Sequence, residues 1–325
     1  LMPDRNGGSH RYGFNGMERN DEMEGSGNSY ITYFRILNSR LGRWHSPDPE
    51  SHKLPNKSPY QTFSNNPIIY IDPAGDTDFY NRQGDWIGTD GDPKTSDIKV
   101  VVKDKKLAKT ITKNSLKGLK YTQEINSAQI FQLPADQVLK EGMQVLNRTL
   151  KPTSQESSSN PQFIPDTKGG LHEEGSQFTQ DLSEKKQLEP GSASTTNSTG
   201  QAAKIKFDRD QKFENGISIH SHPTKIIVKG KGNSIYTGEI HTNGSLSLGD
   251  DQVFRFFSLN IIVGRLGSFS FDAYNQNYKS DPRPLGFAFY AKRTLVLMIG
   301  KEAIQKIISG KQGKTYERYT NAKKS

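Results

Sequence analysis

Two histidines stand two residues apart in the segment 216–223, which reads Gly-Ile-Ser-Ile-His-Ser-His-Pro. The β-branched residues before them alternate as in a strand, and residues two apart on a strand share one face. His220 and His222 are therefore predicted to project together. Pro223 removes a ladder donor and ends the strand, which places the pair at a sheet edge or rim. Two adjacent imidazoles suit zinc, which takes nitrogen ligands at about 2.0–2.1 Å.

Carboxylates must complete such a site, because the chain contains no cysteine and thiol chemistry is excluded. Glu173 and Glu174 precede the histidines, and Asp250 follows them, three residues after Ser247. Neighbours on a strand face opposite ways, so only one of the two glutamates can reach the histidines. Each residue also has a purely structural interpretation. The glutamates fit solvated strand-edge charges, and Ser247 with Asp250 fits a helix capping box.

The segments around these residues predict an α+β domain over 163–325. The expected elements are strands at 261–263, 286–290 and 294–299, a helix start at 252–257 and a short helix at 302–308. A hairpin insertion is expected between the turn signals at 232–233 and 243–244. His172 and His241 are predicted to be surface residues and not ligands.

The chain before this domain divides into two further parts. Residues 11–75 are dense in turn formers and aromatics and predict short strands between turns. From residue 76 the expected elements are a hairpin at 79–91 turning at Gln-Gly, a strand at 98–103 and a helix at 134–150. Two polar stretches, 151–162 and 183–203, are interpreted as loops or linkers. The predicted division is 1–75, a connecting segment at 76–162, and 163–325.

Composition limits the partners that the chain can have. The hydrophobic fraction of 31% and mean hydropathy of −0.79 are low for one continuous core. The charge of +9 permits nucleic-acid contacts, but the basic residues are scattered and not interleaved with aromatics, which favours a solvated lysine-rich surface. No apolar run is long enough to span a bilayer. The start lacks a signal-peptide pattern and is typical of a segment cut from a longer chain.

Several motifs in the first quarter of the chain occur in the order of a known family and resemble the RHS repeat-associated core domain. They are Tyr-Gly-Phe-Asn-Gly at 12–16, the run 35–49, Ser-Pro-Tyr at 58–60, Asn-Asn-Pro at 65–67 and Ile-Asp-Pro-Ala-Gly at 71–75. The resemblance implies that residues 1–75 are the end of a large β-cocoon of YD repeats. In that family the variable region after the Asp-Pro-x-Gly signature is usually a toxin.

The later order Glu … His-Ser-His-Pro … Ser-x-x-Asp resembles the JAB/JAMM (MPN+) metallopeptidase motif, and most of all the JAB-like toxin domains behind RHS cores. This resemblance implies a mixed β-sheet with flanking helices and zinc held by His220, His222 and Asp250. Asp251 is the alternative ligand if the register differs by one. Such a set leaves an open position for a water whose pKa the metal lowers. The spacer between Pro223 and Ser247 is longer than in the family, so the insertion must loop out.

The same resemblance assigns the remaining roles. Glu173 or Glu174 would be the general base, with Glu173 preferred because Ser176 follows it at the family's spacing, and the Ser247 hydroxyl would donate to the oxyanion. The implied protein is an RHS effector tip acting as a zinc peptidase or isopeptidase. It would be secreted and act on a protein in the target-cell cytoplasm, with an immunity protein protecting the producer. The alternatives are a metal-dependent nuclease toxin and a catalytically inactive JAB-like binding module.

Overall fold

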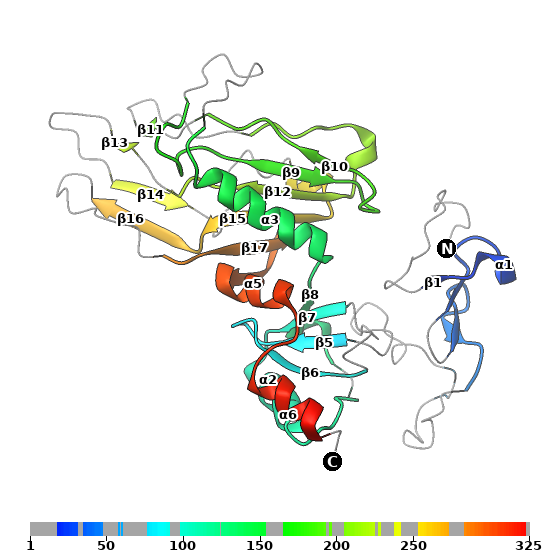
Figure 1. Cartoon of the computed structure of the whole chain (residues 1–325). Helices are drawn as coiled ribbons and strands as arrows, with labels where there is room; N and C mark the ends of the chain where they lie inside the picture. Colours follow the sequence, from blue (N-terminus) through cyan, green and yellow to red (C-terminus); the bar gives the residue numbers. More distant parts are fainter. Residues whose placement is uncertain are drawn as a thin grey trace. The chain divides into compact units, whose positions relative to one another are not determined.

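The chain combines several β-sheets with few helices, which agrees with the predicted α+β class (Figure 1). This computed structural model describes residues 18–31, 35–47, 58, 60, 77–91, 98–123, 125–153, 165–192, 195–196, 205–224, 227–228, 237–241, 253–272 and 283–322. Two compact units result: Leu1–Leu133 with Lys311–Ser325, and Pro134–Gly310. No helix among the described residues is long and apolar enough to cross a membrane.

The first described segment is a small antiparallel meander. Its elements are β1 (Glu18–Arg19), α1 (Asp21–Glu24), β2 (Ser29–Ile31), β3 (Ile36–Asn38) and β4 (Arg43–Trp44). The buried side chains of Tyr30, Leu37 and Trp44 form its core. The short strands and turns expected in this region are confirmed at the described positions.

A second small fold in the same unit is a four-stranded sheet covered by helices. Its strands, in the order β6-β5-β7-β8, are Trp86–Thr89, Thr77–Tyr80, Ile98–Val102 and Ile130–Gln132. The β5–β6 hairpin turns at Gly84, whose φ of 79° favours glycine. Helices α2 (Lys105–Ser115) and α6 (Lys314–Ala322) complete the fold, and Trp86 packs edge-on against Tyr316 and Tyr319 of α6.

The second unit is built on a six-stranded sheet in the order β10-β9-β12-β15-β17-β18. In that order the strands are Lys185–Gln187, Gly175–Phe178, Ile217–Ser221, Leu259–Arg265, Leu285–Ala291 and Thr294–Gly300. β12 and β15 are parallel, and all other neighbours are antiparallel. The interiors of β15 and β17 are buried without alternation, as expected for strands covered on both faces.

Helices lie on both faces of this sheet. α3 (Asp136–Thr149) and α5 (Lys301–Ser309) pack on one face (Figure 1), where a Cβ on Gly142 would meet the Phe287 ring at 2.4 Å. The absence of a side chain at Gly142 therefore lets α3 approach the sheet closely. The 3₁₀ turn Gln211–Phe213 and the helix at 253–256 cover the other face, in a core that includes Phe213, Phe254 and Ile262. Smaller pairs join β11 (Thr195–Thr196) to β13 (Ile227–Val228) and β14 (Thr237–His241) to β16 (Ser268–Asp272).

Several expectations differ from this arrangement. The helix α3 belongs to the second unit and α6 to the first, whereas the sequence division gave them to the connecting segment and to the last domain. The polar stretch 183–203 contains β10, an edge strand whose side chains are all exposed and which gave no apolar signal. β12 is an inner strand, so the edge position expected for the histidine pair is wrong, while the position at the strand's end is confirmed. The expected insertion turns lie outside the described residues.

Candidate functional site

The histidine pair lies at the carboxyl end of β12, in the interior of the second unit. His220 is the fourth residue of the strand, and His222 follows its last residue and donates its backbone N–H to Val263 of β15 at 3.0 Å. Their ring centroids are 5.2 Å apart with an interplanar angle of 48°, and both residues are buried. The prediction that the two rings project together is confirmed.

Aromatic side chains surround His220 on that face of the sheet. Its ring lies 5.6 Å from the Phe207 ring and 6.2 Å from the Phe254 ring, both in near-perpendicular contacts. Phe254 belongs to the helix at 253–256, and its side chain is fully buried. The pair thus lies in a largely apolar, water-poor environment, in which a bound cation would be strongly held by its ligands.

The register between β9 and β12 decides which glutamate shares a face with the histidines. The two strands pair antiparallel with His220 opposite Gly175, and the Ser221 N–H donates to the Glu174 carbonyl at 2.8 Å. Continued by two residues beyond His220 and Gly175, this register places Glu173 opposite His222. Directly opposed residues project to the same face of a sheet, so Glu173 faces the side of the histidines and Glu174 the other side.

Glu174 takes part in an ionic network between the sheet and α3. Its carboxylate accepts hydrogen bonds from Arg148 Nε at 3.1 Å and lies 3.3 Å from His172 Nε2. Arg148 also donates to Glu141 at 3.1 Å, and Ser176 donates to the same carboxylate at 2.7 Å. Glu174 is 6% exposed, so its interpretation as a solvated edge charge is wrong.

His172 is the centre of the buried end of this network. It is fully buried, and its two ring nitrogens lie 2.8 Å from Asp166 and 3.3 Å from Glu174, so the predicted surface position is wrong. Burial alone would lower the pKa of His172, but hydrogen bonds and charge attraction from Glu174 and Asp166 together raise it above its usual value. Burial alone would raise the pKa of Asp166, yet His172 and the N–H groups of Leu171 and Lys168 hold it below its usual value.

Glu141 is the anion at the α3 end. Burial disfavours its charge, but hydrogen bonds from Lys185 and Ser176 and the Arg148 guanidinium hold the pKa of Glu141 below its usual value. Glu141 is 2% exposed, and Lys185 reaches it from β10 at 2.7 Å. The network is therefore an ionised assembly in which Arg148 lies between Glu141 and Glu174. His172 lies between Glu174 and Asp166, and Lys185 pairs with Glu141.

Three predicted site residues, Ser247, Asp250 and the alternative ligand Asp251, lie outside the described residues. The helix that follows them in the sequence is described and packs on His220 through Phe254. His241 lies on β14, opposite Ser268 of β16. Within the described ranges, which leave out Asp250, no group of three or more histidine, aspartate or glutamate side chains is placed to hold a metal ion.

The observed donors fit a zinc ion in type and spacing. Two imidazoles that share a tetrahedral zinc, with Zn–N bonds of about 2.0–2.1 Å, have ring centroids about 5 Å apart, and the observed separation is 5.2 Å. A neutral imidazole binds a metal through its one unprotonated ring nitrogen, a donor type that suits zinc.

Sequence reasoning missed the residues of the ionic network. Arg148 and Glu141 are polar positions on an otherwise amphipathic helix, and Asp166 stands in a Gly-rich turn, so none carried a local signal. A comparison of the chain with protein-family models, with curated proteins and with solved structures finds no match.

Proposed function

We propose that the unit at 134–310 is a zinc-dependent peptidase or isopeptidase of the JAB type, and that the chain is the effector end of an RHS protein. His220, His222 and Asp250 would hold the metal, Glu173 would be the general base, and Ser247 would donate to the oxyanion. The fold supports this reading with a mixed sheet flanked by helices, and with a helix directly after the Ser-x-x-Asp segment.

The observation that carries the proposal is the pairing of His220 and His222 with centroids 5.2 Å apart, on the face to which the β9–β12 register directs Glu173. The two imidazoles at the end of β12 would be the donors, and the carboxylate of Glu173, just before β9, would be the base beside them. The aromatic side chains around His220 exclude bulk water, which strengthens the electrostatic interactions of the site.

Zinc held there would supply a Lewis acid and a water that loses its proton near neutral pH. The chain's own residues do the rest. Glu173 accepts the proton of the attacking water and later delivers it to the leaving amine, so that one carboxylate is base and then acid. The Ser247 hydroxyl donates to the oxygen that gains negative charge as the amide carbonyl becomes tetrahedral.

The wider setting is part of the same proposal and rests on the first quarter of the chain. Residues 1–75 would close an RHS cocoon, and the chain would be secreted and delivered into a target cell. Its partners would be a protein substrate there and an immunity protein in the producer. Figure 1 gives the described part of this segment as the short meander β1–β4, which agrees with a β-rich remnant.

Metal content of the purified full chain tests the proposal. We expect about one zinc per wild-type chain, the stoichiometry of a single catalytic site, and none in a His220→Ala/His222→Ala variant. A His45→Ala/His241→Ala variant removes two imidazoles elsewhere and should keep the metal. The full chain is needed because a fragment starting at residue 163 would lack α3, which belongs to the second unit. It would also separate α6 from the rest of the first unit.

A zinc-free wild type, prepared without chelator and folded, would contradict the metal centre. If zinc binds, Glu173→Gln should retain it and lower the rate of toxin action on cells by about 10²–10⁴-fold, the usual contribution of a general base. Growth inhibition accompanied by degraded DNA or RNA with intact proteins would instead favour a nuclease.

A further inference from the structure

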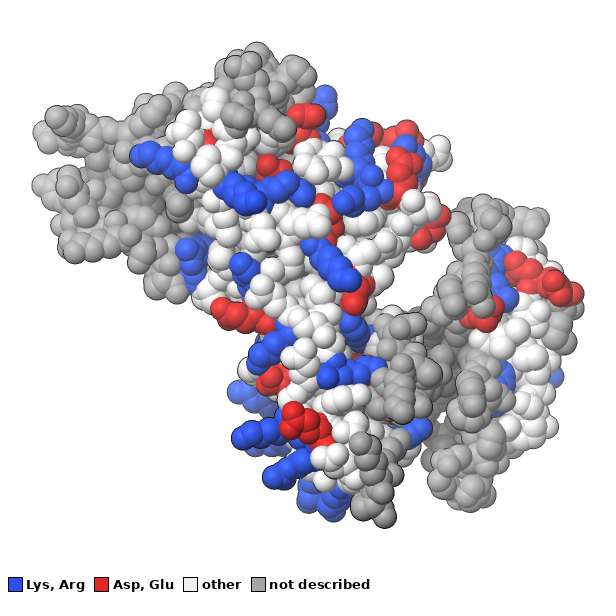
Figure 2. Space-filling model, in the orientation of Figure 1, with Lys and Arg blue, Asp and Glu red and all other residues white. Residues whose placement is uncertain are grey.

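The helix α2 and the turn after it carry a run of lysines that nothing in the described structure neutralises. The six exposed lysines of this α2 patch are Lys105, Lys106, Lys109, Lys113, Lys117 and Lys120. Among the described residues none of them forms an ion pair. Figure 2 shows basic side chains predominating at the lower edge of the view, where α2 and α6 lie.

These lysines are placed where they weaken the helix that bears them. Lys105 and Lys106 occupy the first turn of α2, which has no acidic residue, although a helix N-terminus favours negative charge. Lys105 with Lys109, and Lys109 with Lys113, are like charges one turn apart, which repel each other. Asp104, beside this run, serves as the N-cap and accepts from the Leu107 N–H at 2.7 Å. An anionic partner would remove this repulsion.

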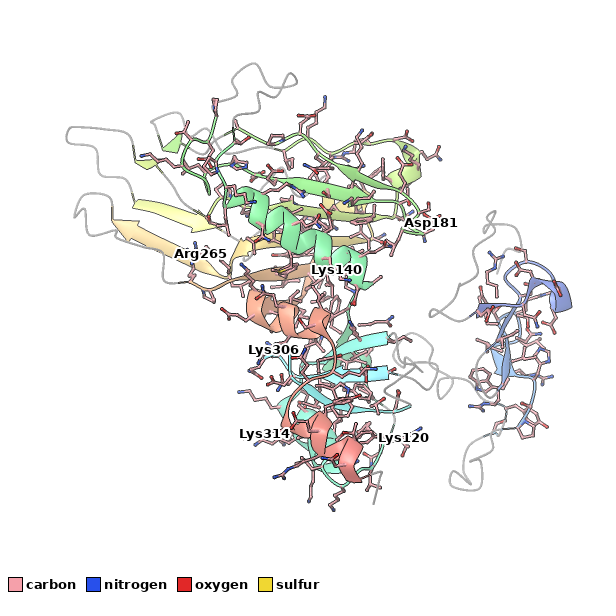
Figure 3. All side chains as sticks on the ribbon, in the orientation of Figure 1. Lys120, Lys140, Asp181, Arg265, Lys306 and Lys314 are labelled. Atoms are coloured by element: carbon pink, nitrogen blue, oxygen red, sulfur yellow. The ribbon has the colours of Figure 1, made fainter. Side chains whose placement is uncertain are left out.

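Two exposed leucines lie among the lysines at the end of the patch. Leu116 is 40% and Leu119 is 54% exposed, and they alternate with Lys117 and Lys120 in the turn after α2. Lys120 is labelled in Figure 3. Gly118, between the leucines, has a φ of 72°, a left-handed conformation that favours glycine in this turn. The end of the patch therefore exposes apolar and basic side chains at neighbouring positions of the chain.

We propose that the α2 patch binds an anionic phospholipid surface. The lysines would contact the negative head groups, and Leu116 and Leu119 would enter the boundary between head groups and acyl chains. A nucleic-acid groove would instead offer aromatic platforms or arginines among the lysines, and the described patch has neither. The inference is independent of the zinc site, which belongs to the other unit.

Vesicle binding of the full chain tests this proposal. We expect cosedimentation with phosphatidylcholine vesicles that contain phosphatidylglycerol, and little with phosphatidylcholine alone. Lys113→Gln/Lys117→Gln/Lys120→Gln should weaken binding about 100-fold, because each lysine near an anionic surface changes affinity about 5-fold. Leu116→Ser/Leu119→Ser should weaken it about 10-fold or more through lost apolar burial. Both variants alter exposed side chains, and circular dichroism should confirm that they fold.

The control is Lys151→Gln/Lys168→Gln/Lys206→Gln, which removes the same charge from exposed positions in the second unit. It should bind vesicles almost as wild type does. If this control weakened vesicle binding equally, net charge alone would explain the binding, and the proposal that the α2 patch binds the lipid surface would be overturned. The leucine variant could instead keep full vesicle binding, while the chain binds duplex DNA tightly and the lysine variant does not. That result would overturn the proposal and identify nucleic acid as the ligand of the patch.

Discussion

The two faces of the β9–β12 pair both have histidine and glutamate at the ends of these strands, but the surroundings of these residues differ. On one face His220 and His222 lie together among aromatic rings, with Glu173 directed to the same side by the register. On the other face His172 and Glu174 are held by Asp166 and Arg148 in an ionic network. A paired network fixes the backbone between α3 and the sheet, and this rigid backbone presents the first face.

Histidine and glutamate therefore do not mark a site by themselves. Glu173 and Glu174 are neighbours in the sequence, yet one belongs with the proposed chemistry and the other with packing. The ionic face should therefore control stability without affecting metal binding, and the histidine face should control metal binding without a comparable effect on stability.

The largest effect is expected from Arg148→Met. It leaves the buried carboxylates of Glu141 and Glu174 without their shared cation, and removing one partner of a buried pair costs about 3–5 kcal/mol. We expect the free energy of unfolding of the second unit to fall by about 3 kcal/mol, at the lower end of that range. Lys185 and His172 still contact the two carboxylates and limit the loss. Zinc content should not change.

The chain contains its own control for this measurement. Both tryptophans, Trp44 and Trp86, belong to the first unit, so their fluorescence during urea unfolding reports that unit, while far-ultraviolet circular dichroism reports both. Arg148→Met should lower the second unit's transition and leave the tryptophan transition in place. Lys186→Met, which breaks an exposed pair with Asp208, should change neither by much. An Arg148→Met effect no larger than that of Lys186→Met would contradict the network's role.

A smaller and sharper test separates the two neighbouring glutamates. Glu174→Gln removes the charge between Arg148 and His172 and should lower the free energy of unfolding by about 1–3 kcal/mol, with zinc retained. Glu173→Gln should change it by less than about 0.5 kcal/mol while lowering the proposed toxin action on cells by about 10²–10⁴-fold. The reverse pattern would mean that the register does not continue past Gly175 as inferred.

Local patterns predicted much of this arrangement, and long-range pairing accounts for the rest. The period of two placed His220 beside His222, and the amphipathic pattern placed α3 within two residues of its observed ends. The same period says that Glu173 and Glu174 face opposite ways. Only the register with β12, more than forty residues on, tells which faces the histidines.

The ionic network could not be predicted, because its members have no local signature. Arg148 is 26 residues from Glu174 in the sequence, and Ser176 is 35 residues from Glu141. A lysine or arginine in the last turn of a helix ordinarily complements the dipole and stays in solvent. Likewise, β10 is an all-exposed strand, so its position at the sheet edge follows from pairing with β9 and not from its composition.

The smallest expected effect is on the pH dependence of the stability that the ionic face contributes. The pKa of His172 is raised by Glu174 and Asp166 despite its burial, so the folded state holds this proton more tightly than the unfolded state does. Its contribution to stability is fully present below the unfolded pKa of about 6.5 and is lost as pH rises through the higher folded pKa. Asp166, whose pKa is lowered, contributes above its unfolded pKa of about 3.9 and loses that contribution in acid.

The wild type should therefore exceed a His172→Gln variant in unfolding free energy most at slightly acid pH, and this difference should shrink as pH rises above neutrality. Urea unfolding of the second unit at a series of pH values measures it. His45→Gln, a histidine paired with Glu24 in the first unit, is the control and should leave the second unit's transition unchanged at every pH. A difference that grows with pH would mean that His172 is neutral in the fold. The network would then be held by Arg148 and Lys185, without a charged histidine between Asp166 and Glu174.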